Sequence, residues 1–320
     1  MKANFLNENF IEVISSKFPK KSELANALMD ILNIEKEAVY RRLRSEVLFS
    51  FYEVTLVAQK LGISLQDFAG VASTKSRPYH LKLTNWVEPE EIDYYMINEY
   101  LDLLREIKDD PTAELGAAIK MFPDAFHLRY KNITTYYLFK WIYQYSSPES
   151  KKYFSEIKAT ERSLSLLKEM RHLYNLIKTR DYILDKKIFQ NLVDDLSYFG
   201  SIRLITPDEL ASIKEELFYL VDYLESLAVS GVNEEGNNVK LYISDVNFET
   251  DFSYLSSTNY KLSLIRTFTL YDIASLDDFT FDISKRWLNS LKRTSTLISE
   301  SGQLQRIDFF NKQRQIVDSL

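Results

Sequence analysis

The spacing of apolar residues predicts a series of short helices through the first 70 residues of the chain. Phe10, Ile14 and Phe18 fall on one helical face, and Pro19 ends that helix. The same spacing predicts further helices over residues 22–32, 35–44, 50–61 and 64–69. The N-terminal segment is therefore expected to form a small helical bundle.

Helical spacing also dominates the longer remainder of the chain. It predicts helices over residues 89–108, 112–121, 125–145, 150–179, 185–199, 207–229, 280–298 and 304–317. Four prolines (Pro111, Pro123, Pro148 and Pro207) stand near expected helix starts, where a missing N–H costs little. This part of the chain is therefore expected to be helical over most of its length.

One segment of the remainder has a different pattern. The turn-forming residues 231–238 (GVNEEGNN) are followed by stretches rich in β-branched and aromatic residues at 240–248, 251–255 and 260–273. This pattern predicts a small antiparallel sheet near residues 239–274. The expected fold class is mainly α, with an N-terminal helix-turn-helix bundle and a larger helical C-terminal domain that contains this small β-sheet.

A polar stretch with a proline, VASTKSRPYHLKLTNW, separates the two helical parts. It is typical of a linker, which we place at residues 73–87. The expected domains are a helix-turn-helix domain at 1–72 and a regulatory or dimerisation domain at 88–320.

The helix-turn-helix is predicted from residues 22–44. Asn33 separates two short helices, and asparagine is the best non-glycine residue for a left-handed turn. The apolar residues expected to face inward are Leu28, Leu32, Ile34, Val39 and Leu43. Such a motif requires apolar contacts at the helix crossing and an exposed polar face on the second helix. Both are present in the sequence.

This segment resembles the helix-turn-helix of Cro/repressor-like bacterial transcription regulators. ILNIEKEAVYRRLRSE is similar to their turn and recognition helix, and FSFYEVTLVAQKLGISLQDF is similar to their closing helices. AVYRRLR also resembles the BetR-type motif. Two positions differ from the family pattern, because Asn33 replaces a glycine and Met29 replaces a small alanine. We expect Met29 to separate the two helices slightly.

The resemblance implies that residues 35–44 enter the major groove of double-stranded DNA. The residues expected to contact the groove are Lys36, Glu37, Tyr40, Arg41 and Arg44, of which the arginines suit guanine best. Phosphate contacts that set the register are expected from Lys20, Lys21, Ser22, Arg42 and Ser50. Ser22 and Ser50 are also the expected N-caps of their helices.

Charge leaves a second interpretation open. The net charge is 40 − 46 = −6, divided between +1 in residues 1–75 and −7 in the remainder. Many dedicated DNA-binding domains are more basic than this N-terminal segment. The alternative is a helical protein–protein interaction module whose helix-turn-helix does not bind DNA.

Composition argues against most enzyme classes. The chain has no cysteine, 3 histidines and 7 glycines, so we expect no catalytic residue, no metal site and no cofactor. His127 either lines a ligand cavity or is a satisfied core residue. The aromatic residues between Tyr136 and Tyr145 form either a pocket or, as we favour, core. The acidic pairs at 194–195, 234–235 and 277–278 are expected in solvated loops.

Partners and location follow from the same features. The first residues, MKANFLNENF, have no apolar leader, and no apolar run reaches the length of a membrane span. A cytoplasmic protein without a membrane partner is expected. A single small head binds DNA weakly, so a homodimer is expected, and the large C-terminal domain leaves room for a small-molecule or protein effector.

Overall fold

A computed structural model describes residues 2–18, 20–61, 63, 79–81, 83–145 and 152–320. The chain divides into two compact units, Met1–Tyr79 and His80–Leu320, which we call the head and the body. The helix expected at 64–69, Pro19 and residues 73–78 of the expected linker lie outside the described residues.

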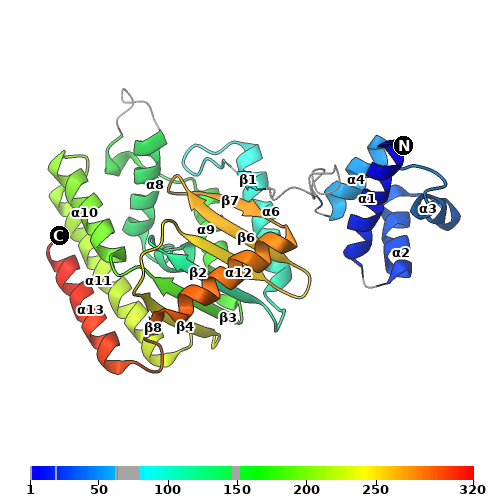
Figure 1. The fold of residues 1–320 in the computed structure, drawn as a ribbon. Helices are drawn as coiled ribbons and strands as arrows, with labels where there is room; N and C mark the ends of the chain where they lie inside the picture. Colours follow the sequence, from blue (N-terminus) through cyan, green and yellow to red (C-terminus); the bar gives the residue numbers. More distant parts are fainter. Residues whose placement is uncertain (1, 19, 62, 64–78, 82, 146–151) are drawn as a thin grey trace. The chain divides into compact units, whose positions relative to one another are not determined.

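The head is a bundle of helices around one apolar core (Figure 1). Its described helices are α1 (Lys2–Ser16), α2 (Lys21–Leu32), α3 (Lys36–Leu43) and α4 (Phe51–Leu61). Phe10 and Leu28 are fully buried in this core, and the rings of Phe10 and Phe49 meet edge to face with 5.1 Å between their centroids. Every described helix contributes apolar residues to the core, so the orientation of α3 is fixed by packing.

Over its described residues, the body is built on an eight-stranded mixed sheet with the strand order β1-β7-β6-β5-β2-β3-β4-β8. The strands are β1 (His80–Leu81), β2 (Glu114–Ile119), β3 (Thr179–Leu184), β4 (Asn238–Ser244), β5 (Phe252–Ser256), β6 (Lys261–Thr267), β7 (Tyr271–Ser275) and β8 (Ser295–Leu297). Strands β2, β3 and β4 pair in parallel, and the other pairings are antiparallel.

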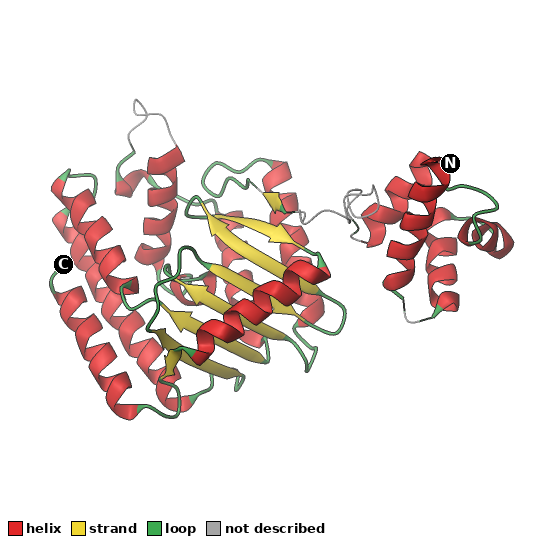
Figure 2. Ribbon diagram, viewed as in Figure 1, coloured by secondary structure: helices red, strands yellow, loops and turns green. Residues whose placement is uncertain are grey.

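Helices cover both faces of this sheet (Figure 2). The larger layer consists of α6 (Glu91–Ile107), α7 (Asp124–His127), α8 (Lys131–Tyr145), α9 (Glu161–Leu176), α10 (Ile188–Ser201), α11 (Pro207–Ser230) and α13 (Gln303–Asp318), with a short 3-10 helix at Phe154–Glu156. The opposite face is crossed by α12 (Asp278–Arg293), as Figure 1 shows. Alternate residues of β2 serve both layers, since Ala117 packs in the main core and Ala118 packs under α12.

Ion pairs as well as apolar contacts attach α12 to the sheet. Lys292 donates to Asp181 of β3 at 2.5 Å, and Lys285 donates to Glu114 of β2. These lysines flank Leu288, which is fully buried. The second face of the sheet is therefore closed by one helix with an apolar centre and charged contacts on either side.

The expected fold class is wrong for the body. The chain is neither all-alpha nor mainly α with a small antiparallel sheet, because an eight-stranded mixed sheet runs through the body. Residues expected to be helical form β2 within 112–121 and β8 at the end of 280–298, while β3 lies almost entirely between the helices expected at 150–179 and 185–199. β2 is a short run, apolar or glycine after Glu114 and covered on both faces, and periodicity cannot distinguish such a strand from a piece of buried helix.

The division into two units predicts separate responses to core mutations. Leu28→Ala in the head is expected to cost about 2–5 kcal/mol, because Leu28 is fully buried. All three tryptophans (Trp86, Trp141 and Trp287) belong to the body. Chemical denaturation of Leu28→Ala, followed by circular dichroism, should therefore show the head unfolding at a lower denaturant concentration than in the native chain. The unfolding midpoint measured by tryptophan fluorescence, which reports on the body, should not change. Leu220→Ala in the body is the matched control, and a common shift of both signals with either variant would contradict independent units.

Candidate functional site

The turn between α2 and α3 has the geometry that the sequence predicts. Asn33 caps α2 in the left-handed region, with φ 50° and ψ 51°. Val39 on the inner face of α3 is fully buried in the head core, and Met29 packs on the edge of that core. The left-handed asparagine reverses the chain within a few residues, so α3 packs across α2 and leaves its outer face exposed.

The outer face of α3 carries most of the residues expected to contact the DNA groove. Lys36, Glu37, Arg41 and Arg44 are exposed, whereas Tyr40 is half-buried and packs on the head core. Arg44 itself stands at the C-cap of α3, directly after its last helical residue. The helix therefore presents a polar strip with one aromatic ring at its edge.

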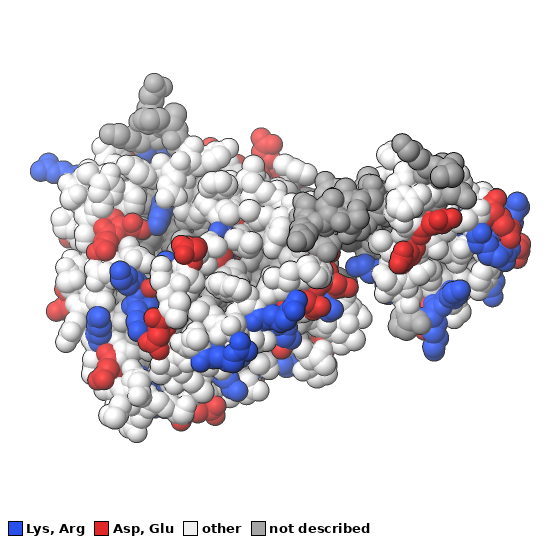
Figure 3. Space-filling model, viewed as in Figure 1, with Lys and Arg blue, Asp and Glu red and all other residues white. Residues whose placement is uncertain are grey.

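Acidic side chains accompany the arginines of this strip. Arg44 donates to Glu46 at 2.6 Å and to Glu37 at 3.0 Å, while Arg41 lies 3.7 Å from Glu46. Figure 3 shows basic and acidic atoms side by side over this end of the head. Water and salt screen exposed ion pairs of this kind, so a phosphate or a base edge can displace the carboxylates at small cost.

The expected phosphate contacts have different environments. Lys20, Lys21 and Ser22 are exposed at the start of α2, and Ser50 is exposed at the start of α4. The expected N-cap role of Ser22 is wrong, because α2 begins at Lys21 and its N-cap Lys20 makes no side-chain cap. The role of Ser50 as an N-cap is confirmed, since its hydroxyl accepts from the Glu53 N–H at 3.2 Å.

Arg42 differs from the other basic residues of α3. Its guanidinium donates to Glu53 of α4 at 2.7 Å, and the two side chains are only 17% and 14% exposed. It also donates to the Ala38 carbonyl at 3.2 Å. Arg42 therefore joins α3 to α4 and is less available to a phosphate than the exposed lysines of α2.

We predict that Arg42→Ala destabilises the head by about 1–3 kcal/mol, because it leaves the Glu53 carboxylate half-buried without its partner. Burial alone would raise the pKa of Glu53, but hydrogen bonds from Arg42 and Ser50 hold this pKa below its ordinary 4.5. The stabilisation is therefore fully present above about pH 4.5 and is lost as the pH falls through the lowered pKa.

Chemical denaturation at pH 7 and pH 3, followed by circular dichroism, measures this effect. Arg41→Ala is the matched control, since Arg41 is 54% exposed and its nearest carboxylate lies 3.7 Å away. Equal stabilities of the two variants at pH 7 would show that the Arg42–Glu53 pair does not stabilise the head.

A second candidate site is a cavity of about 480 Å³ in the body. It lies between α6 and α9 on one side and strands β6 and β7 on the other, with α7 and α8 contributing further wall. Its volume falls within the range of about 300–1,000 Å³ that is usual for small-molecule sites. The aromatic residues of its wall are Trp86, Tyr100, Tyr137, Tyr174, Tyr260 and Tyr271.

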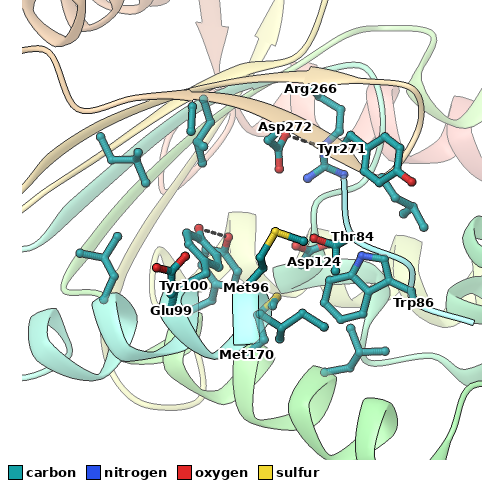
Figure 4. Close-up of a pocket in the computed structure, with 18 of the residues that line it drawn as sticks. Thr84, Trp86, Met96, Glu99, Tyr100, Asp124, Met170, Arg266, Tyr271 and Asp272 are labelled. Carbon is teal, nitrogen blue, oxygen red and sulfur yellow. Dashed lines mark hydrogen bonds and ion pairs between the residues drawn. The ribbon is translucent and has the colours of Figure 1, made fainter. Parts of the chain in front are cut away.

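A charged cluster occupies one wall of this cavity (Figure 4). Arg266 of β6 donates through Nε to Asp272 of β7 at 2.8 Å, and the two side chains keep 18% and 30% exposure. Burial raises the pKa of Asp272, although Arg266 opposes that shift. The pKa of Arg266 is raised despite its burial, because it lies near Asp272 and Asp124.

Asp124 belongs to the same cluster and is oriented by His127. The two residues are hydrogen-bonded across one turn of α7, with 3.1 Å between Nε2 and Oδ1. Burial alone would raise the pKa of Asp124, but the His127 hydrogen bond and the charge of Arg266 hold it below its ordinary value. His127 is a buried residue that lines the cavity, but its Nδ1 has no hydrogen-bond partner among the described residues, so the expectation of a satisfied core histidine is wrong.

Asp251 connects this cluster to the end of β2. Its carboxylate accepts from the Lys120 N–H at 2.6 Å and the Met121 N–H at 3.2 Å, and its carbonyl accepts from the Arg266 N–H at 3.0 Å. Burial raises the pKa of Asp251 to about 6. This residue therefore holds the segment after β2, which leads into α7, against β6, the strand that carries Arg266.

Hydroxyl and carboxylate groups line the α6 side of the cavity. The hydroxyls of Tyr100 and Tyr174 share a hydrogen bond of 2.6 Å, drawn in Figure 4. Glu99, Asp102 and Glu106 of α6 also line the cavity, and Asp102 accepts from Arg105 at 2.6 Å. Most of the residues that line the cavity are therefore aromatic or aliphatic, while most of its charged residues are acidic.

The other candidate residues from the sequence, the aromatic residues and the acidic pairs, mainly stabilise the fold. Tyr136, Phe139 and Trp141 are buried core residues, and Tyr137 is both core and cavity wall. The expectation of solvated loops is wrong for 194–195, which lie in α10, where Asp195 accepts from Lys140 at 2.5 Å. Of the other two acidic pairs, Asp277 caps α12, and Glu234 takes two hydrogen bonds from Arg129.

Sequence reasoning did not identify Asp124, Arg266 or Asp272 as site residues. Asp124 lies more than a hundred positions before Arg266 and Asp272, and the three residues meet through the pairing of β6 with β7 and the end of β2. One local signal exists, because Arg266 and Asp272 are charged residues within β6 and β7, whose other residues apart from Lys261 are uncharged.

Comparisons with protein-family models, with curated proteins and with solved structures found no match. Function must therefore be inferred from the two sites. In the described ranges, His, Asp and Glu side chains nowhere gather in a group of three suited to a metal ion. None of the described helices combines the length and apolar character that a membrane crossing requires.

Titration of Asp251 gives a test of the charged cluster. Its raised pKa means that the folded chain binds this proton more tightly than the unfolded chain, so ionisation between about pH 4 and 6 destabilises the fold. We expect the free energy of unfolding of the native chain to fall by about 2–3 kcal/mol relative to Asp251→Asn across that interval. Urea denaturation from pH 4 to 6.5 measures the difference, and a constant difference would contradict the buried titration.

Proposed function

We propose that the chain is a sequence-specific DNA-binding transcription regulator whose head binds an operator and whose body dimerises or responds to a signal. The observation that carries this proposal is the geometry of α2, the left-handed Asn33 and α3. Packing fixes α3 through Val39 while its opposite face presents Lys36, Arg41 and Arg44. This arrangement is what major-groove recognition by a helix-turn-helix requires.

The dimensions of α3 suit the proposed role. Its 8 residues span about 12 Å, which is comparable to the width of the major groove. Arg41 lies on the exposed face in the last turn and is positioned to donate to the O6 and N7 atoms of a guanine. Lys20 and Lys21 at the start of α2 are suited to phosphates beside the groove.

Dimerisation and signal response complete the proposal. One head with few phosphate contacts binds weakly at cellular salt, so two heads are needed for a stable complex. Their half-sites would lie about 34–36 Å apart, or a multiple of that spacing. The body supplies a cavity of about 480 Å³ that suits a small effector. A cytoplasmic location and the absence of catalysis belong to the same proposal.

The interaction module remains the second candidate, and one observation favours it. The arginines of α3 are matched by Glu37 and Glu46, which reduces the positive potential of the face that would meet DNA. A protein partner could exploit the same alternating charges. Binding to duplex DNA distinguishes the two functions.

Selection of random duplexes by the full chain tests the proposed function. We expect an enriched two-fold symmetric motif that the Arg41→Ala/Arg44→Ala variant no longer selects. If Arg41 contacts a guanine, Arg41→Ala alone should cost about 1–3 kcal/mol and relax the preference at one position.

Arg286→Ala/Arg293→Ala is the matched control, because it removes two exposed arginines from α12 in the body. This control should select the same motif as the native chain. If folded native protein enriches no sequence at low salt, the DNA-binding proposal is wrong and the interaction module is favoured.

A further inference from the structure

We propose that the cavity of the body binds a small organic cation, an amine attached to an apolar group. The inference concerns the body alone and stands on the chemistry of the cavity wall. It would identify the class of effector if the chain is a regulator, but it does not depend on DNA binding by the head.

The charges around the cavity favour a cation. Beside the guanidinium of Arg266, its wall contains the carboxylates of Asp124 and Asp272, and these two acids outnumber that one cation. Glu99, Asp102 and Glu106 also line the cavity from α6, where they are exposed to solvent. In a cavity of low polarity, such an excess of negative charge attracts a positive ligand more strongly than it would in water.

Arg266 is already engaged by the protein. Its Nε donates to Asp272, its Nη1 donates to the Thr269 carbonyl at 3.3 Å, and it also lies near Asp124 and Asp251. A ligand carboxylate approaching Arg266 would meet these acids as well. Arg266 is therefore better placed to hold Asp272 and Asp124 in position than to bind an anion.

The aromatic wall favours an organic cation. Trp86, Tyr100 and Tyr271 face the same space as Asp124 and Asp272 in Figure 4. Ring faces attract an ammonium group, and the attraction grows when the cation is removed from water. A metal ion would need a compact group of oxygen or nitrogen ligands, and the described residues offer no such group.

The rest of the wall suits an apolar group on the amine. Met96 of α6 and Met170 of α9 line the cavity together with leucines of the helices and of the sheet. Methionine adapts its shape to irregular ligands. The ammonium group would lie near Asp272 and Asp124, with its apolar group between α6 and α9. This division matches the usual small-molecule site, which is mostly apolar with a few convergent polar groups.

Three probes of matched shape test the inference on the full chain without DNA. They are 4-phenylbutylamine, 4-phenylbutan-1-ol and 4-phenylbutyrate, which carry a positive, a neutral and a negative end. Calorimetric titration at pH 7 should show the amine binding at least about ten-fold more tightly than the alcohol, with the carboxylate weakest. Trp86 lines the cavity, so its fluorescence should change on binding, and Trp86→Phe should remove that change.

Variants locate the ammonium group. Asp272→Asn should reduce the preference for the amine over the alcohol to less than about three-fold, because the charged acceptor is lost. Asp245→Asn is the matched control, since Asp245 accepts from Lys186 at 2.5 Å in the same unit but does not line the cavity. The control should keep the full preference for the amine.

The probe series on the native chain remains decisive even if Asp272→Asn fails to fold. Tighter binding of the carboxylate, equal binding of amine and alcohol, or no binding of the amine would each overturn the inference. None of these results bears on DNA binding, so failure here is distinguishable from failure of the proposed function.

Discussion

The body depends on strand β2, which pairs in parallel with β3 on one side and antiparallel with β5 on the other. Because β5 runs in the opposite direction, its beginning lies beside the carboxyl end of β2. Asp251, just before β5, can therefore accept the Lys120 and Met121 N–H groups that follow β2. The chain then turns into α7, where Asp124 joins the charged cluster beside Arg266.

This change of strand direction places the charged cluster at one end of a cavity that extends over β6 and β7. Here the helices α6 and α9 cover β6 and β7 without filling the space above them, and aromatic side chains line the remaining volume. The buried charged groups are stabilised by hydrogen bonds from backbone N–H groups and by pairing with one another. The fold therefore tolerates acidic residues in the cavity wall.

The sequence predicts the head far better than the body, for a physical reason. The left-handed Asn33, the inward Val39 and the N-cap Ser50 depend on residues close in sequence, and local pattern identified them. The helix start at Pro207 is confirmed in the same way, since Thr206 and Glu209 cap α11 reciprocally. By contrast, β2 and β3 are defined by pairing across distant segments, and the cavity needs β6, β7 and α7 to meet.

The most direct test of the account is the salt dependence of binding between the full chain and duplex DNA. We predict that the logarithm of the binding constant falls linearly with the logarithm of salt concentration, with a slope of about −0.9 for every phosphate neutralised. Lys20→Ala/Lys21→Ala should reduce that slope by about 1 for each lysine without changing sequence preference. Folded protein that fails to bind duplex DNA at low salt, or binds it equally at all salt concentrations, would contradict the account.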